Sequence, residues 1–388
     1  MNRKSILLTV SIILILSLTL IGNTLAGGID NFATGTRAIS MGCSYVGIAD
    51  DASAVYHNPG GLAFIENDTV WMEGYTWISF SHMRYTGPLG EEESDDVNFV
   101  PGTFISKSYE KWSFGYGIYC PFATGGMSFD NFQGTNKTLE YAMGYLAFTP
   151  AVAYKVNSKF SIGLGFSLFS GMMESNAPNI NTYVWEESEY DNISAGYGAS
   201  IGLMYKPTSQ LSVGLRIESE VPISLDGTIK NSNEKMDARM EFTTPYTFAL
   251  GLGYKPSPQL MVSIAADYTL WGDMDEIEFK VNGVKNNVQT HYQHCWTFGT
   301  GMEYRLKNDI ALTLGIYYTQ GGTKKEGLSA ANIDTDIVVP DVGIAYNIND
   351  SIEISLVGFY IYGFEEKYNS QKFSQEDPTI MIGIRYQL

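Results

Sequence analysis

Two short segments of this 388-residue chain have residue types and spacing that could carry out chemistry. The adjacent carboxylates of Asp50 and Asp51 could bind a metal ion or act as an acid–base pair. Alternatively, they could order their own segment by accepting hydrogen bonds from backbone N–H groups or by pairing with Arg37. Residues 198–202 read Gly-Ala-Ser-Ile-Gly, which fits the nucleophile-elbow pattern of hydrolases. That elbow needs a helix after its strand, whereas Ser200 lies inside a segment that alternates with a period of two.

The remaining candidates for chemistry are also weak. The four histidines lack the spacing of a closed metal site; they are His57, His82, His291 and His294. The chain has no nucleotide-binding motif, and its formal net charge of −18 excludes the clustered basic residues that nucleic acid requires. The sequence therefore predicts no catalytic site, no metal, no cofactor, no nucleic-acid partner and no enzymatic activity.

The N-terminus has the three parts of a secretory signal. Arg3 and Lys4 form a basic start, residues 6–21 are mostly apolar, and residues 24–26 read Thr-Leu-Ala before the expected cut. We expect residues 1–26 to be removed. No other apolar stretch approaches the roughly 18 residues that a spanning helix needs. The exported chain is then either a soluble protein or a β-barrel.

From residue 69 onward the dominant sequence period is two. Apolar residues alternate with small or polar residues in segments 160–169, 211–218, 260–269, 310–318 and 380–388. Successive strand side chains point to opposite faces, so each segment has one apolar face and one mixed face. A soluble β-sandwich would give the same alternation. The length of about ten residues, the Gly-, Ser- and Thr-rich second face and the Tyr and Trp near strand ends favour a membrane barrel.

The connections between these segments alternate between short and long. Short turns lie near residues 109–111, 156–158, 207–209, 256–258, 307–309 and 348–350, and long polar links lie near 84–97, 122–139, 173–193, 222–243, 272–290, 320–336 and 365–376. Six turns and seven loops predict about fourteen antiparallel strands, an even number as single-chain bacterial barrels have. We expect the long loops to face outward and the short turns to face the periplasm.

Residues 27–68 do not fit the barrel pattern, because they are small, polar and turn-rich without a sustained period. Such a segment could be a disordered leader, but its hydrophobic residues argue against that. In a large barrel it could instead serve as a plug in the lumen. The sequence thus predicts a signal peptide at 1–26 and a transmembrane antiparallel β-barrel at 69–388, and we call residues 27–68 between them the hatch.

Three motifs in the hatch carry a family resemblance. Residues 35–42 read Gly-Thr-Arg-Ala-Ile-Ser-Met-Gly, residues 49–54 read Ala-Asp-Asp-Ala-Ser-Ala, and residues 58–62 read Asn-Pro-Gly-Gly-Leu. They resemble the opening of the FadL/TodX (OMPP1) family of outer-membrane transporters of long-chain fatty acids and other hydrophobic compounds. The resemblance continues at residues 121–122 and 244–251 and covers nearly the whole mature chain.

The resemblance implies a fourteen-stranded, monomeric barrel in bacterial outer-membrane lipid, with residues 27–68 as a hatch inside its lumen, a small hydrophobic ligand and no cofactor. It implies capture of the ligand outside, gating by the hatch and sideways release near a kinked third strand. The implied hatch or gating residues are Asp50, Asp51, Asn58, Pro59 and Gly60. The implied kink residues are Pro121, Phe122, Gly125 and Gly126. The family's Pro-Phe-Gly reads Pro-Phe-Ala here, so the flexible point shifts toward the two glycines.

Adaptable apolar side chains at the strand-to-loop junctions are the candidate ligand contacts. They are Phe122, Met127, Phe129, Met172 and Met173, and simple loop packing is the alternative for all of them. Arg216 and His294 are candidates for a ligand carboxylate. Arg216 shares its face with Glu218, however, so these two residues could pair with each other instead.

Two functions follow from these expectations. The first is passive transport of long-chain fatty acids or similar hydrophobic compounds. The second is a FadL-like barrel that acts as a surface subunit for protein secretion or interaction, which would have a lumen filled by side chains. An open aqueous porin is disfavoured by the hatch.

Overall fold

The computed structural model describes residues 34–66, 68–179, 184–307 and 309–388. The expected signal peptide at 1–26 and the first residues of the expected hatch lie outside these ranges. No helix among the described residues is long and apolar enough to cross a membrane.

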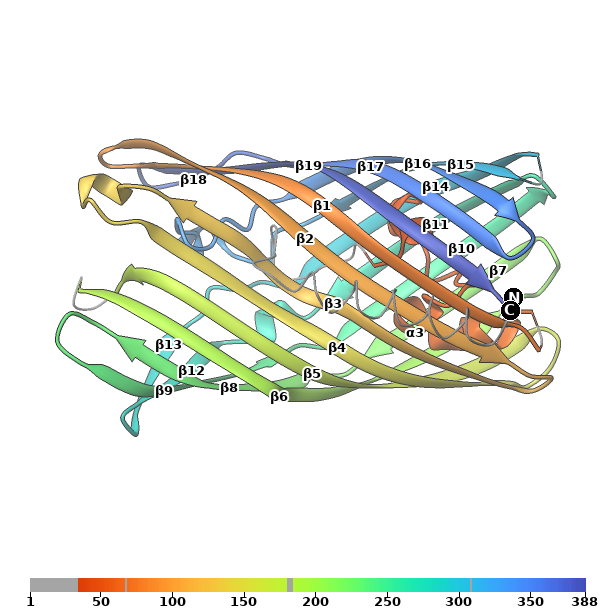
Figure 1. Cartoon of the computed structure of the whole chain (residues 1–388), viewed down its shortest axis with the longest axis horizontal. Helices are drawn as coiled ribbons and strands as arrows, with labels where there is room; N and C mark the ends of the chain where they lie inside the picture. The colour runs from red at the N-terminus through yellow and green to blue at the C-terminus, as the bar shows by residue number, and fades with distance from the viewer. Residues whose placement is uncertain (1–33, 67, 180–183, 308) are drawn as a thin grey trace.

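The described strands close into an antiparallel β-barrel (Figure 1). Each ring strand pairs with the next, and the last pairs with the first through the register Trp71↔Gln387. In order the ring consists of β1 (Val70–Gly87), β2 (Gly90–Ser108), β3 (Trp112–Phe129), β4 (Leu139–Lys155), β5 (Phe160–Pro178), β6 (Trp185–Tyr205), β7 (Leu211–Glu218), β10 (Thr247–Ser257), β11 (Leu260–Thr269), β14 (Cys295–Lys307), β15 (Ile310–Thr319), β16 (Ile337–Asn349), β17 (Ile352–Gly363) and β19 (Gln371–Gln387). The predicted antiparallel barrel is confirmed.

The sheet contains nineteen segments, more than the expected strands, because several long strands are interrupted. Both β7 and β8 pair with β6, so they are two parts of one wall position. The chain likewise passes from β9 to β10 through Pro245, which cannot donate a ladder hydrogen bond. The added segments are β8 (Val221–Lys230), β9 (Lys235–Thr244), β12 (Glu276–Val281), β13 (Val284–Gln289) and β18 (Glu366–Tyr368). These segments extend the wall at its long-loop end (Figure 1).

The two faces of the wall differ as the alternating sequence predicts. On β5 the side chains of Leu164 and Phe166 are 51% and 47% exposed on the outer face, whereas Ser161 and Ser167 are buried on the inner face. A barrel that presents such a band of apolar side chains outward must be surrounded by lipid.

The hatch lies inside the barrel, as predicted, close to the end where the C-terminus is found (Figure 1). It contains α2 (Thr36–Ile39), α3 (Ala54–His57) and the 3-10 helix η1 (Pro59–Phe64). These helices are too short to be stable alone. Nearly every described hatch residue is buried, so the hatch takes its shape from packing against the inner wall.

Candidate functional site

Glycines on the inner wall let the hatch backbone lie directly against the barrel. A Cβ atom at Gly214 of β7 would lie 1.9 Å from the carbonyl oxygen of Val46, and one at Gly299 of β14 would lie 1.9 Å from that of Gly42. Both distances are far below van der Waals contact, so a side chain would push the hatch away. Hatch atoms come similarly close to Gly163, Gly202, Gly251, Gly301 and Gly315. Part of the chain's high glycine content thus serves to dock the hatch.

Gly214→Ala is expected to destabilise the docked hatch by about 1–3 kcal/mol, the usual cost of overpacking. Amide hydrogen exchange on the full-length chain in detergent should show lost protection around residues 42–50. The matched control is Gly358→Ala, which adds the same carbon on β17 where nothing lies within 4 Å. If the two variants exchange alike, the hatch does not rest on the wall at Gly214.

Asp51 fastens the hatch to the last strand. Its Oδ2 accepts a hydrogen bond from the Tyr45 hydroxyl at 2.6 Å and lies 3.0 Å from Nη2 of Arg385 on β19. Its Oδ1 accepts from the backbone N–H of Ser53 at 3.1 Å and from the Ser53 hydroxyl at 2.6 Å. The Asp51 side chain is 3% exposed, so these contacts lie in a low-dielectric setting that strengthens them.

Arg37 forms a second link between hatch and wall. Its Nε lies 2.6 Å from Oε2 of Glu303 on β14, and its Nη1 forms an ion pair with Asp50. The same nitrogen donates to the Tyr45 hydroxyl at 2.9 Å. The two aspartates therefore order their own segment, which was the alternative to a metal or acid–base pair. Asp50 forms an ion pair with Arg37, and Asp51 accepts hydrogen bonds from Tyr45 and Ser53.

Sequence reasoning missed the wall partners of these links, Glu303 and Arg385. Each has one signal in the sequence, a charged residue on the small-residue face of an alternating strand. No group of three or more His, Cys, Asp or Glu residues among the described residues is placed to hold a metal ion.

Asn58 organises the turn that contains Pro59 and Gly60. Its Oδ1 accepts a hydrogen bond from the Gly60 backbone N–H at 3.0 Å and so caps η1. Pro59 begins that helix at a position where a backbone N–H would have no partner within the helix. Its Nδ2 donates to the carbonyl oxygens of Val46 in the hatch and Leu203 on β6, both at 2.9 Å. These three residues thus form a docked turn against the wall.

His57 is a neutral part of the hatch. Burial lowers its pKa to about 4, although the hydrogen bond between its Nε2 and the Thr34 carbonyl oxygen, at 2.6 Å, opposes that shift. Its ring packs edge-on against Tyr45 and Tyr56 at centroid distances of 5.2 and 4.8 Å. The ring therefore acts as a packed donor and not as a charge inside the lumen.

Arg216 on β7 holds the hatch and does not face an open ligand site. Its Nη1 donates to the Tyr56 carbonyl oxygen at 3.2 Å, and its guanidinium carbon lies 4.8 Å from the Tyr56 ring centroid. It also lies 3.3 Å from Glu218 and 3.5 Å from Asp267. The pairing with Glu218, considered from the sequence, is present, and the basic residue is engaged by hatch and wall.

Strands β2 and β3 pair only near their short-turn ends. Their register ends at Thr103 and Ile118, although β2 begins at Gly90 and β3 continues to Phe129. Over the same stretch β1 stays paired with β2, and β4 stays paired with β3. The wall therefore lacks strand pairing at one position in its long-loop half.

Irregularities in β3 accompany this interruption. The register between β3 and β4 shifts between residues 119 and 122 and again between residues 124 and 127. Such bulges add an unpaired residue and bend the strand. Pro121 lies in the first shift and lacks an N–H donor, and Gly125 and Gly126 lie in the second. Phe122 lies at the edge of the first shift, and its side chain falls outside the described structure.

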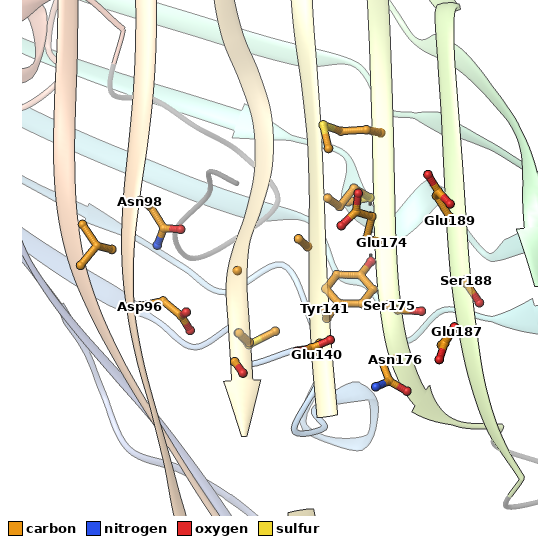
Figure 2. Close-up of a pocket in the computed structure, with 17 residues that line it drawn as sticks. Asp96, Asn98, Glu140, Tyr141, Glu174, Ser175, Asn176, Glu187, Ser188 and Glu189 are labelled. Carbon is orange, nitrogen blue, oxygen red and sulfur yellow. Dashed lines mark hydrogen bonds between the residues drawn. The ribbon is translucent and has the colours of Figure 1, made fainter. Parts of the chain in front are cut away.

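A pocket of about 670 Å³ lies at this interruption (Figure 2). Asp96 and Asn98 of β2 line one side, and Met127 of β3 and Met172 of β5 line the other. Asn98 is 2% exposed on the inner face, whereas Met172 is 38% exposed on the outer face. Residues of both faces of the wall therefore contribute to the lining of the pocket.

A buried apolar cluster lies toward the long-loop end of the barrel. This mouth cluster consists of Met83, Tyr85, Met127, Phe129, Leu139, Leu328, Ala330, Ile333 and Phe373. Leu328, Ala330 and Ile333 come from the loop between β15 and β16, which folds inward onto the wall. Because Met127 also lines the pocket, the mouth cluster and the pocket are contiguous.

The predicted ligand contacts therefore separate into groups. Met127 and Phe129 lie in the mouth cluster, and Met173 lies in the main core, 8% exposed. Met172 faces the other way, because neighbouring strand residues point to opposite faces. His294 does not face the lumen: it lies on the outer face, its ring centroid 5.8 Å from that of Tyr268 and its neighbours the aromatic residues at the strand end. The carboxylate contact predicted for His294 therefore remains a prediction, at a position outside the lumen and 3.9 Å from Oδ1 of Asp273.

A closed antiparallel barrel with an internal hatch and an interrupted wall defines an outer-membrane β-barrel protein. A family model described as outer membrane protein transport protein (OMPP1/FadL/TodX) matches residues 20–386. The chain belongs to this family, as the motifs in the hatch indicated.

Similar proteins share this architecture at low identity. The long-chain fatty acid transport protein of Escherichia coli O6:H1 is 21% identical over 406 residues, covering 89% of this chain and 91% of that protein. The crystal structure of a Pseudomonas aeruginosa FadL homologue has a TM-score of 0.79 at 17% identity, covering 93% of this chain and 99% of that one. The Pseudomonas putida toluene transporter TodX has a TM-score of 0.73 at 16% identity, covering 94% and 99%. The structural likenesses show the fold.

Proposed function

We propose that this chain lets small hydrophobic compounds cross the outer membrane passively. A compound binds at the mouth cluster, enters the barrel above the hatch and leaves sideways through the interruption between β2 and β3. The observation that carries this route is the missing strand pairing beyond Thr103 and Ile118, with a pocket lined by residues of both faces of the wall at that place.

The mouth cluster supports the first step. Met127 and Phe129 lie beside Leu328 and Ile333 of an inward-folded loop, so displacement of the loop would expose apolar side chains to a ligand. Methionine and phenylalanine adapt to ligands of different shape. The same Met127 lines the pocket, which leaves a short path from the mouth to the wall.

The hatch supports sideways exit. Its backbone lies against the inner-wall glycines, and Asp51 and Arg37 hold it to β19 and β14. A hydrophobic ligand would have to break these contacts to pass straight through. Exit into lipid instead keeps its apolar surface out of water, which is favourable by roughly 25 cal/mol per Å². No energy source is needed, because the ligand moves down its own gradient.

The names of similar proteins suggest the class of ligand. The relative from Escherichia coli is a long-chain fatty acid transport protein, and the similar structure from Pseudomonas putida is a toluene transporter. Both ligands are hydrophobic and small enough for a pocket of about 670 Å³.

Native mass spectrometry of the detergent-purified full-length chain, followed by organic extraction, tests the proposal. We expect one hydrophobic molecule bound per chain, released by the extraction. A chain that carries no such molecule, binds none when 1-dodecanol is added and instead retains a second protein would contradict transport and favour an interaction subunit.

A further inference from the structure

Carboxylates surround the pocket between β2 and β3. They are Asp96 on β2, Glu140 on β4, Glu174 on β5, and Glu187 and Glu189 on β6, and we call them the acidic rim. Figure 2 shows the Glu140 and Glu187 side chains gathered with Asn176 at one end of the pocket. No lysine or arginine is found among the described residues that line it.

The acidic rim destabilises the pairing of the strands that carry it. Glu174 and Glu189 stand directly opposite each other in the register of β5 and β6. Like charges directly opposite on adjacent strands destabilise the pair. Among the described rim carboxylates Glu187 has an ion-pair partner, Lys230 at 2.9 Å, and both of these side chains are more than half exposed to solvent. Lys137 is also close enough for its charge to act on Glu187. Replacing one of the two facing glutamates with a basic residue would turn repulsion into attraction and stabilise the sheet. The carboxylates are present despite that gain, which indicates that their charge has a role.

The position of the rim makes its charge effective. Below it on the same outer face of β5 lie the apolar residues Leu164, Phe166 and Leu168, so the pocket borders the lipid-facing band. Charges next to a low-dielectric wall are screened less than charges in open water. A ligand head group inside a pocket of this size lies within about one Debye length, roughly 10 Å at 0.1 M salt, of several rim carboxylates.

The lumenal arginines that the structure describes are already engaged. The lumenal arginines Arg37, Arg216 and Arg385 already pair with carboxylates of the hatch and wall. An anionic head group would therefore meet five rim carboxylates in the pocket, against the two lysines beside Glu187, Lys230 and Lys137. An uncharged head group would not be repelled by the rim carboxylates.

We propose that the acidic rim makes this chain pass uncharged hydrophobic compounds and reject carboxylate anions such as ionised fatty acids. This inference rests on the proposed function and specifies its substrate class. The ligand named for the Escherichia coli relative, a fatty acid, is then disfavoured here. The rim carboxylates are the specificity-determining groups, acting through charge and not through contact with an apolar tail.

The test compares two ligands of equal length, 1-dodecanol and dodecanoate, by equilibrium binding to the full-length chain in neutral detergent at about pH 8, where the acid is ionised. The wild-type chain should bind dodecanol and bind dodecanoate far more weakly. Replacing Glu140→Gln, Glu174→Gln and Glu189→Gln together should tighten dodecanoate binding about tenfold, equal to about 1.4 kcal/mol. Dodecanol binding should not change, and high salt should mimic the variant for dodecanoate.

The matched control neutralises carboxylates away from the pocket, Glu110→Gln in a short turn with Glu234→Gln in a long loop. It should leave both affinities as they are in the wild type. Equal binding of the two ligands by the wild type, with no effect of the rim substitutions, would overturn the inference and leave the proposed function standing. Failure of dodecanol itself to bind would overturn the proposed function.

Discussion

A disulfide between positions 98 and 126 is expected to stop uptake while leaving ligand binding at the mouth cluster intact. Asn98 on β2 and Gly126 on β3 face each other across the interruption, and a Cβ atom at Gly126 would lie 3.7 Å from Oδ1 of Asn98. No other atom lies within 4 Å of that Cβ, so the Cβ atom of Asn98 is more than 4 Å from it. Disulfides need Cβ atoms about 3.5–4.5 Å apart, so Asn98→Cys with Gly126→Cys should form one once the two strands move slightly together.

The expected loss follows from where the bond would lie. It would tie β2 to β3 in the stretch where they share no strand pairing, and it would lie in the lining of the pocket, to which Asn98 and Gly126 both contribute. Of the mouth-cluster residues, Met127 directly follows position 126 in the sequence, and the others belong to other parts of the chain or lie beyond it on β3. Entry of radiolabelled 1-dodecanol into cells that produce the oxidised double variant should fall to the rate of cells without the chain.

Reduction of the same protein should restore uptake, which separates closure of the gap from misfolding. Each single variant adds one thiol without a crosslink and should transport normally in oxidising medium. These variants also test whether the buried cysteines Cys43, Cys120 and Cys295 react. Uptake that continues in the oxidised double variant would show that ligands leave by another path.

The barrel could be predicted from the sequence because its physical requirement is simple. A strand with lipid on one face and a packed lumen on the other must alternate, as residues 160–169 do, and this period survives in a single sequence. The interruptions within wall strands could not be predicted, since they depend on local features such as Pro245 and leave the alternation on either side unchanged.

The site was predictable only in part, for a different reason. The hatch residues Arg37, Asp51 and Asn58 stand in recognisable motifs, but their wall partners Glu303, Arg385 and Leu203 lie far away in the sequence. Long-range pairing is set by the closure of the barrel, which no local pattern records. The acidic rim was missed similarly, because its carboxylates come from four strands and only the register places them together.

Loss of Arg37 is expected to release the hatch more than any single neutral substitution. In Arg37→Met, Glu303 keeps its buried carboxylate, 6% exposed, but loses a partner at 2.6 Å. Removing one partner of a buried ion pair costs about 3–5 kcal/mol, because the remaining charge is left in a low-dielectric site. Arg305, at 3.1 Å from Glu303, limits the loss to the lower part of that range.

The decisive measurement is the recovery of the double variant Arg37→Met with Glu303→Gln. Replacing both charges removes the stranded carboxylate, so protection of hatch amides from hydrogen exchange should return toward the wild-type level. Lys367→Met, which removes an exposed partner of Glu365, should leave that protection unchanged. If Arg37→Met alone keeps full protection, packing against the inner-wall glycines and not the ion pair holds the hatch. If the double variant is no more protected than the single one, the loss of protection comes from the missing Arg37 contacts with Asp50 and Tyr45. The ion pair between Arg37 and Glu303 then does not hold the hatch in place.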